Sequence, residues 1–399
     1  MKNAAAKTKA AAGLLVLITL FCSACETGNT DRTLRFSAKQ TEALYQSVRN
    51  QEGRLPRSAD AEGNLVTSGD DYWCSGFTAG TLWYLYEYTR DDRLKAAAED
   101  LTRRVERQQY TTDNHDVGFM VGCSYGNAYR LTGCPEYRAA VVNAARSLAT
   151  RFDPVRGVIR SWDHPQWHFP VIIDNMMNLE LLCEASRLSG DPSFRTIALS
   201  HADTTLKYHF RPDGSSCHVV DYGVPEDGAY RRQTHQGYAD GSAWARGQAW
   251  ALYGYTMMFR ETRKPEYRAQ AMKIARFILG HPRLPADKIP YWDFDAPGCD
   301  GKEPLRDASA GAIIASALLE LSTFAEEPLA ETYREAAKTQ VATLASPAYL
   351  ATAASNAHFI LRHSVGHFPH RSEIDVPLTY ADYYFVEALL RMKQLKIKF

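Results

Sequence analysis

The stretch TGCPEYRAAVVNAARSLATRF (residues 132–152) starts with a polar turn, continues with a proline, an aromatic residue and an arginine, and then follows an amphipathic helical pattern. Two later stretches repeat this order, SGDPSFRTIALSHADTTLKYHF (residues 189–210) and TRKPEYRAQAMKIARFILGH (residues 262–281). A proline is tolerated in the first turn of a helix, where its missing N–H has no intrahelical partner. Self-similarity of this kind indicates a fold of repeated helical units.

Helices of a second kind lie between the amphipathic ones. They begin near an acidic residue and are rich in small and aromatic residues, as in DDYWCSGFTAGTLWYLYEY (residues 70–88) and RDASAGAIIASALLELSTF (residues 306–324). An amphipathic helix faces solvent on one side, whereas a helix that is apolar all round is buried. The two kinds therefore predict an outer and an inner layer.

The pattern predicts twelve helices of these two kinds. They span residues 37–50, 73–89, 92–109, 117–131, 135–150, 174–188, 192–208, 243–261, 265–279, 308–324, 329–345 and 377–394. Six inner and six outer helices make an all-α fold, an (α/α)6 barrel or toroid. No composition break or low-complexity linker interrupts it, so we expect one domain over residues 37–399.

If the inner helices run parallel, their N-termini all lie at one end of the barrel, which we call the mouth. The long loops at residues 151–173, 209–241 and 281–306 would line it. The polar residues near these helix starts would then converge; they are Asp70, Asp71, His115, Asp116, Asp174, Asn175, His235, Arg246 and Asp307. A single aspartate at such a position is usually a helix cap, which is our reading of Asp307. Asp116 and Asp174 instead lie among aromatic, amide and small residues, which favours a functional role.

The N-terminus has the features of an export signal. Lysines precede the apolar run GLLVLITLF (residues 13–21), which is too short to span a bilayer. The following CSAC resembles a bacterial lipoprotein cleavage site. We therefore expect a signal peptide over residues 1–24, lipidation of Cys25 and a short tether over residues 25–36. The mature chain would be periplasmic or outer-membrane associated, and would touch a membrane only through this anchor.

Composition excludes several other classes of protein. Lysines plus arginines number 46 and acids number 46, so no basic excess points to nucleic acid. Six cysteines of the expected domain show no CxxC pair, and no histidines have zinc-finger spacing; these cysteines are Cys74, Cys123, Cys134, Cys183, Cys217 and Cys299. We expect buried thiols, with a disulfide as the alternative, and neither a metal nor a cofactor. The oligomeric state stays open.

Four segments carry a resemblance to a known family. HDVGF (115–119), IIDNMMNLELL (172–182), THQGYADGSAWARGQAWALYGY (234–255) and SEIDVPLTYADYYFVEALLR (372–391) resemble the signature segments of unsaturated glucuronyl hydrolases, glycoside hydrolase family 88. The resemblance implies an (α/α)6 barrel. It also implies an enzyme that removes the 4,5-unsaturated uronic acid left by polysaccharide lyases at the non-reducing end of oligosaccharides.

The same resemblance implies roles for individual residues. Asp174 falls on the catalytic acid/base and Asp116 on its partner. His218 and Gln236 match positions that contact the sugar near carbon 4. Arg246 matches a position that pairs with the uronate carboxylate.

Flanking positions are assigned in the same way. Trp250 matches a position that stacks on the sugar ring, with core packing as the alternative. Trp244 and Gln248 are expected to pack or to support the site. His115 either orients Asp116 or makes a structural hydrogen bond.

One departure and two rival functions leave the substrate open. The family pattern leads us to expect Lys-Pro after VGH, whereas this chain has Phe368 and Pro369, followed by His370, Arg371 and Ser372. Either Arg371 supplies the missing charge or the pocket accepts neutral sugars. The rivals are another (α/α)6 enzyme, namely an unsaturated rhamnogalacturonyl hydrolase or a sugar epimerase, and a noncatalytic glycan-binding lipoprotein.

Overall fold

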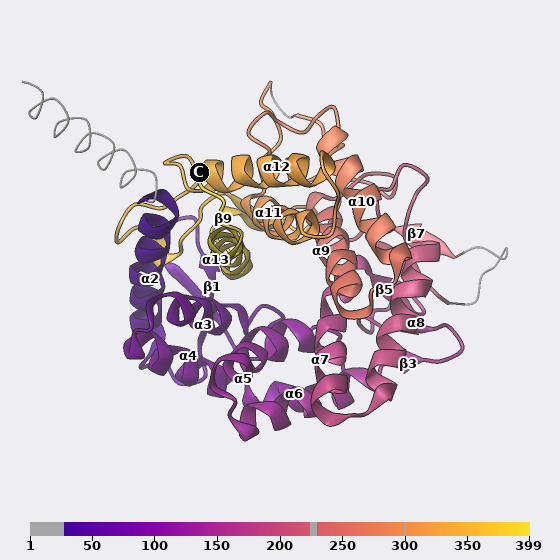
Figure 1. The fold of residues 1–399 in the computed structure, drawn as a ribbon, viewed down its shortest axis with the longest axis horizontal. Helices are drawn as coiled ribbons and strands as arrows, with labels where there is room; N and C mark the ends of the chain where they lie inside the picture. The colour runs from indigo at the N-terminus through magenta and orange to yellow at the C-terminus, as the bar shows by residue number, and fades with distance from the viewer. Residues whose placement is uncertain (1–27, 224–229, 299–300) are drawn as a thin grey trace, which may run out of the picture.

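A computed structural model describes residues 28–223, 230–298 and 301–399, in which helices alternate between two concentric rings (Figure 1). The inner ring consists of α3 (Phe77–Thr89), η2 (Gly118–Gly126) continued by α5 (Asn127–Thr132), η3 (Ile173–Asn178) continued by α7 (Leu179–Ser189), α9 (Ala245–Thr262), α11 (Ala308–Ser322) and α13 (Thr379–Gln394). The outer ring consists of α2 (Gly28–Val48), α4 (Asp92–Arg104), α6 (Pro135–Ala149), α8 (Pro192–Tyr208), α10 (Pro265–Gly280) and α12 (Leu329–Leu344).

The inner ring is closed. Each inner helix packs against the next, and α13 packs against α3. The predicted (α/α)6 barrel is therefore confirmed. Pro135, Pro192 and Pro265 each lie in the first turn of an outer helix, as the repeats predict.

The two rings differ in burial as the sequence pattern requires. Every described residue of α11 from Ala308 to Leu319 is buried, whereas α4 buries one stripe that includes Leu94, Ala98 and Leu101. Because the inner helices contact neighbours on both sides and the outer ring behind, little of their surface is left for solvent.

The first helix corrects the predicted tether. Helix α2 begins at Gly28, so residues 28–36 are helical rather than a linker. Leu34 is fully buried one turn before Ala38, and extends the same packing stripe toward the N-terminus. The predicted signal peptide and the lipidated Cys25 lie outside the described residues. No helix of the described part is long and apolar enough to cross a membrane.

Two inner helices begin irregularly, at the positions where the aspartates of interest lie. Residues Gly118–Gly126 form a π-helix and residues Ile173–Asn178 form a 3-10 helix, where the sequence predicts regular α-helix. Such deviations are frequent at functional sites. A smaller deviation affects the outer ring, where the helix predicted over 92–109 ends at Arg104 and is followed by the 3-10 turn η1 (Glu106–Tyr110).

Small antiparallel sheets occupy stretches that the sequence left as loops. They pair β1 (Leu55–Ala59) with β2 (Leu65–Ser68), β3 (Phe152–Asp153) with β4 (Val158–Ile159), β5 (Pro170–Ile172) with β6 (Val219–Asp221) and β6 with β7 (Arg231–Gln233), and β8 (Ser364–His367) with β9 (Ser372–Val376). A 3-10 turn, η4 (Asn356–His358), precedes the last hairpin.

The cysteines are free thiols where the structure describes them. Cys74, Cys123, Cys183 and Cys217 are buried, as expected, while Cys134 is partly exposed and donates to Glu136. Cys299 lies outside the described residues.

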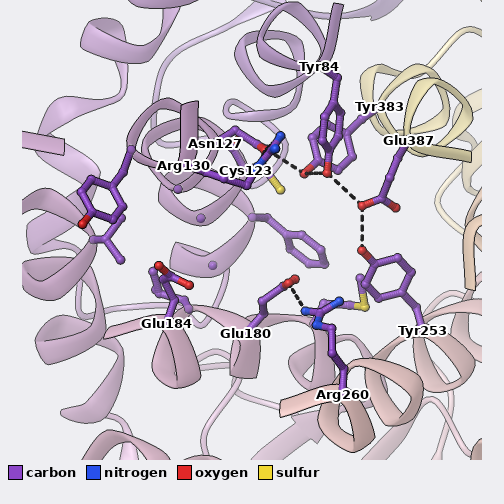
Figure 2. A pocket seen from close by; sticks show the side chains of 18 of the residues that line it. Tyr84, Cys123, Asn127, Arg130, Glu180, Glu184, Tyr253, Arg260, Tyr383 and Glu387 are labelled. Atoms are coloured by element: carbon purple, nitrogen blue, oxygen red, sulfur yellow. Dashed lines mark hydrogen bonds and ion pairs between the residues drawn. The ribbon is translucent and has the colours of Figure 1, made fainter. Parts of the chain in front are cut away.

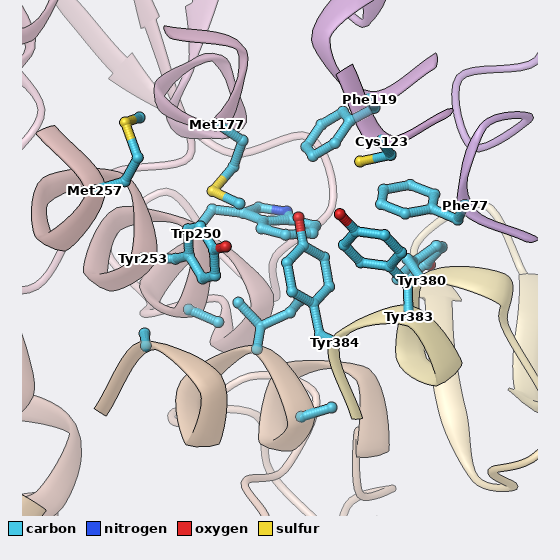
Figure 3. Packing of buried hydrophobic residues seen from close by; sticks show 14 of the residues in the cluster. Phe77, Phe119, Cys123, Met177, Trp250, Tyr253, Met257, Tyr380, Tyr383 and Tyr384 are labelled. Carbon is cyan, nitrogen blue, oxygen red and sulfur yellow. The ribbon is translucent and has the colours of Figure 1, made fainter. Parts of the chain in front are cut away.

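An aromatic layer fills the centre of the barrel (Figure 3). Trp250 packs against Phe119 and Tyr384, with ring centroids 5.2 and 5.4 Å apart, and Phe77 packs against Phe119 and Tyr383. These rings come from α3, η2, α9 and α13. They form a floor between the N-terminal and the C-terminal ends of the inner helices.

Candidate active site

Two carboxyl groups lie where inner helices begin. Asp116 precedes η2 and Asp174 lies in the first turn of η3. Their side chains are 14% and 11% exposed, which leaves each almost desolvated yet reachable from the mouth. Burial and, to a smaller extent, the charge of Asp174 together raise the pKa of Asp116 to about 8. Burial also raises the pKa of Asp174 to about 7, although the Arg246 charge opposes this shift. At least one proton is therefore held on the pair near neutral pH.

His218 lies beside Asp174 in a defined tautomer. Its Nδ1 accepts the backbone N–H groups of His235 and Gln236, at 3.0 and 3.1 Å. Burial keeps the pKa of His218 well below its usual value, so the ring is neutral and its proton resides on Nε2. That N–H faces Asp174 Oδ2 at 3.8 Å, and both atoms are buried without a hydrogen-bond partner among the described residues.

A second histidine lies beside Asp116. His115 Nε2 is 3.4 Å from Asp116 Oδ1, while Asn178 Nδ2 donates to His115 Nδ1 at 3.3 Å. The amide orientation of Asn178 is fixed because its Oδ1 accepts the N–H of Phe119. Burial lowers the pKa of His115 to about 3, so this ring is neutral too. His115 therefore makes a structural hydrogen bond, the second of the two roles predicted for it, and places its Nε2 beside Asp116.

Gln236 lies at the mouth, in the loop between β7 and α9. Its Nε2 donates to the carbonyl of Gly366 at 3.1 Å, and its backbone N–H helps to orient His218. The side chain is only partly buried. The structure therefore brings Gln236, His218 and Asp174 into one site, as predicted.

Arg246 lies at the same site, but with other partners than predicted. Its guanidinium is 1% exposed and donates to Asp307 at 3.3 Å and to the carbonyls of Val365 and Gly366. The fork that was predicted to hold the uronate carboxylate is occupied by the protein itself. Arg246 therefore fixes the β8–β9 hairpin to the mouth. Asp307 caps α11 through the N–H of Ser309, as predicted, and is also the partner of this buried cation.

Trp250 departs from its predicted role in a similar way. Its side chain is fully buried in the aromatic floor, so neither ring face is open for stacking on a sugar (Figure 3). The core-packing alternative describes it better. Its Nε1 has no hydrogen-bond partner among the described residues, and its proximity lowers the pKa of Asp174.

The two predicted supporting residues have structural partners. Trp244 packs on His218 with ring centroids 4.4 Å apart and lies against the Arg246 guanidinium. Gln248 accepts the N–H of Ser216 and donates back to its carbonyl, which fixes the chain just before His218. Asp70 has other partners, since Arg107 and Gln108 donate to its carboxylate.

The sequence reasoning missed two contributions to the site. Asn178, which orients His115, lies four residues after Asp174, and this helical spacing was the available signal. The second is a cluster of rings at the rim, in which Trp162 stacks on Trp167 and His235 contacts His367 and His370. No periodicity signalled this cluster, since its members come from three separate loops.

A separate cavity of about 670 Å³ lies in the barrel. It is lined mainly by residues of the inner helices, among them Tyr84, Glu180, Tyr253, Arg260 and Glu387 (Figure 2). Several of its hydroxyl and charged groups are paired with one another, as in the bonds of Tyr84 and Tyr253 to Glu387. Neither Asp116 nor Asp174 lines it, so this cavity is distinct from the site of the two carboxyl groups.

Comparison with known proteins shows the family. The model of Glycosyl Hydrolase Family 88 matches residues 45–392. The chain belongs to glycosyl hydrolase family 88. An unsaturated glucuronyl hydrolase of Formosa agariphila is 46% identical over 329 residues, which is 82% of this chain and 81% of that protein. An unsaturated chondroitin disaccharide hydrolase of Streptococcus pyogenes is 34% identical over 84% of this chain and 85% of its own length.

Solved structures of family 88 enzymes are similar throughout the fold. An unsaturated glucuronyl hydrolase described as specific for heparin is 46% identical, with a TM-score of 0.87 over 92% of this chain and 98% of its own. The enzyme from Bacillus sp. is 30% identical, with a TM-score of 0.83 over 92% and 98% of the two chains. The chain is therefore a glycoside hydrolase of the unsaturated glucuronyl hydrolase type.

Proposed function

We propose that this chain removes the 4,5-unsaturated uronic acid from the non-reducing end of lyase-generated oligosaccharides. The observation that carries the proposal is the pair Asp116 and Asp174, nearly desolvated at the mouth and with both pKa values raised. A noncatalytic glycan-binding module needs no such pair. The family membership and the names of its relatives support the same activity.

The chemistry uses the enol ether of the unsaturated ring. Asp174 gives its proton to carbon 4, which creates an oxocarbenium-like centre at carbon 5. Water adds at carbon 5 and returns a proton to the Asp174 carboxylate, which acts as the base for this step. The hemiketal opens by breaking the bond between carbon 5 and the ring oxygen, and the hemiacetal left at carbon 1 releases the next sugar. No displacement at the anomeric carbon takes place, unlike in ordinary glycosidases.

The neighbours of the pair support these roles. Asp116 shares the proton of the pair with Asp174 and contacts sugar hydroxyls, and a negative charge on either carboxyl group disfavours ionisation of the other. Beside Asp174 Oδ2, His218 presents an N–H that has no partner in the described part of the chain, and such a buried donor is suited to bind a sugar oxygen or the developing carboxylate. Gln236 contributes amide groups at the rim. The enzyme needs no cofactor for these steps.

The β8–β9 hairpin bears on the sugar next to the uronate. Where a lysine is expected, Phe368 is 40% exposed and stacks on Trp292 with centroids 4.4 Å apart and planes at 12°. Arg371 is exposed three residues further on. We propose glycosaminoglycan fragments as the substrate class, because relatives named for heparin and for chondroitin disaccharides share the fold. An aromatic face in place of a lysine favours uncharged groups on the contacted part of that sugar.

The decisive assay follows the near-ultraviolet absorbance of the unsaturated uronate. Purified protein is expected to abolish this signal with lyase-generated disaccharides, whereas Asp174→Asn and Asp116→Asn are expected to be severely impaired with the fold intact. General acid catalysis by one positioned group typically supplies about a hundred- to ten-thousand-fold. A sugar epimerase would leave the double bond in place, and a noncatalytic glycan-binding protein would leave the whole disaccharide unchanged. Persistence of the signal with wild-type protein would overturn the proposal.

We also propose that the chain is exported and lipidated at Cys25, and is held at a periplasmic or outer-membrane face by that anchor. The support is the lysine-rich start, the short apolar run and the CSAC sequence. Cys25→Ser is expected to release the protein or leave it unprocessed. Mass spectrometry that finds an unmodified N-terminus elsewhere in the native host would contradict this assignment.

A further inference from the structure

Three histidines converge at the rim of the mouth. His235 comes from the loop before α9, and His367 and His370 come from the β8–β9 hairpin. Each histidine has one ring nitrogen that lies within 4.8 Å of a ring nitrogen of both other histidines. The ring of His235 meets those of His367 and His370 edge-on, at centroid distances of 4.7 and 5.0 Å. We propose that this histidine cluster (His235, His367, His370) binds a divalent transition metal ion such as Zn²⁺.

The chemistry of the cluster suits a borderline cation. Neutral imidazoles are good ligands for zinc, copper and nickel, whereas magnesium and calcium prefer oxygen ligands. Burial and the neighbouring histidines lower the pKa of His235 and His367 to about 4 and 3, so both rings are unprotonated at neutral pH. The nearest buried cation, Arg246, already has Asp307 as an anionic partner at 3.3 Å. The positive charge of Arg246 is thus balanced by Asp307, beside a cluster whose three rings contact one another.

An unpartnered atom points to a ligand within the cluster. His367 Nε2 is buried and has no hydrogen-bond partner among the described residues. Its Nδ1 accepts the backbone N–H of His370 over a long 3.3 Å. Metal binding at Nε2 would move the ring proton to Nδ1 and give up this weak bond, a small loss beside a metal–nitrogen bond.

One ring must move for all three nitrogens to share an ion. The rings of His367 and His370 are stacked, with centroids 3.9 Å apart and planes at 5°. A metal ion lies in the plane of each ring that binds it, and two parallel planes share no point. His370 is exposed, so its ring has room to rotate toward the common centre. Three histidines then leave a fourth tetrahedral position for water or another oxygen ligand.

The cluster links two elements that border the catalytic pair. The backbone N–H of His235 orients His218, and the hairpin that carries His367 is held by Arg246 and Gln236. A bound ion would bridge the β7–α9 loop to the hairpin across the rim. We therefore expect zinc to stabilise the folded chain and to slow substrate entry, while the metal-free enzyme keeps its activity.

The test is metal binding by tag-free protein that has been treated with a chelator and then dialysed. Zn²⁺ is titrated against a chromophoric chelator, and Co²⁺ is added separately, because tetrahedral Co²⁺ absorbs visible light strongly. One Zn²⁺ per chain is expected. His370→Gln and His367→Gln are expected to weaken binding by about tenfold or more, since loss of even an outer partner of a ligand costs that much.

His168→Gln is the matched control, because the His168 side chain is 83% exposed and is not part of the histidine cluster. It is expected to bind Zn²⁺ as the wild type does. The proposal would be overturned if the wild type bound no Zn²⁺, or if all three variants bound Zn²⁺ as tightly as the wild type. Binding is measured without substrate and catalysis is measured in excess chelator. Failure of the metal site and failure of the proposed function are therefore separate results.

Discussion

Replacement of Arg246 separates a structural role from direct binding of the uronate. In Arg246→Met the side chain keeps its approximate length but loses its charge and its donors. Asp307, which is fully buried, then loses the cation that pairs with it, and the carbonyl of Val365 loses the donor that Arg246 provides. The carbonyl of Gly366 keeps Gln236 Nε2 as a donor.

The expected magnitude follows from these losses. Removal of one partner of a buried ion pair costs about 3–5 kcal/mol of unfolding free energy, because the remaining charge is uncompensated. Three donors stay on Asp307, from Ser309 N, Ser309 Oγ and Val365 N, and they place the expected loss toward the lower end. Arg246→Lys keeps the charge but not the fork, and we expect an intermediate loss of about 1–3 kcal/mol.

The assay is urea unfolding followed by circular dichroism, with steady-state kinetics on an unsaturated disaccharide. Lys264→Met is the control, because its partner Asp203 is 47% exposed and a surface pair is worth about 0–1 kcal/mol. Unchanged stability of Arg246→Met together with a raised KM would refute the structural role. That result would return Arg246 to direct contact with the uronate.

Three further outcomes follow from the geometry. Turnover is expected to fall as pH rises through about 7–8, because the proton-donating form of the pair is lost. The stability that these two raised pKa values contribute is expected to decline from the unfolded pKa of aspartate, about 4, up to about 7–8 and then to level off; a pH–rate profile with parallel unfolding measurements checks both. Trp250→Phe keeps the aromatic packing but removes the indole Nε1 that lowers the pKa of Asp174. The alkaline limb of the pH–rate profile is therefore expected to move to higher pH, and an unmoved limb would argue against this effect of Trp250 on Asp174. Gly118→Ala would place a Cβ against Asn178 Oδ1 and disturb the neighbouring His115 and Asp116, so the activity of this variant is expected to fall. In Gly122→Ala the Cβ would meet nothing within 4 Å, and near-wild-type rates are expected.

Much of the fold could be predicted, because the spacing of apolar residues along the sequence follows the turns of the helices. The first-turn prolines and the alternation of amphipathic with apolar helices identify two rings, and the barrel follows from six pairs. The exact helix starts could not be predicted. The π-helix at Gly118 and the 3-10 turn at Ile173 depend on tertiary contacts, such as the hydrogen bond from the N–H of Phe119 to Asn178.

The context of Asp116 and Asp174 favoured a functional role, and the family resemblance paired them, but the partners of their neighbours could not be predicted. Arg246 and Trp250 lie at the site as predicted, yet burial assigns the first to a hairpin and the second to the aromatic floor. Which carbonyl a buried guanidinium meets depends on the path of residues 364–376, more than a hundred positions away. The short strands there have no periodic signature in the sequence.

Product analysis in aqueous methanol tests the central claim most directly. If Asp174 protonates carbon 4, methanol competes with water at carbon 5. The expected product is then a methyl ketal in which the chromophore is gone and the glycosidic bond is intact, visible by mass spectrometry and NMR. Asp174→Asn should form neither this ketal nor the hydrolysis product at an appreciable rate. A methyl glycoside of the uronic acid that keeps its double bond would show displacement at the anomeric carbon, and would contradict the hydration mechanism.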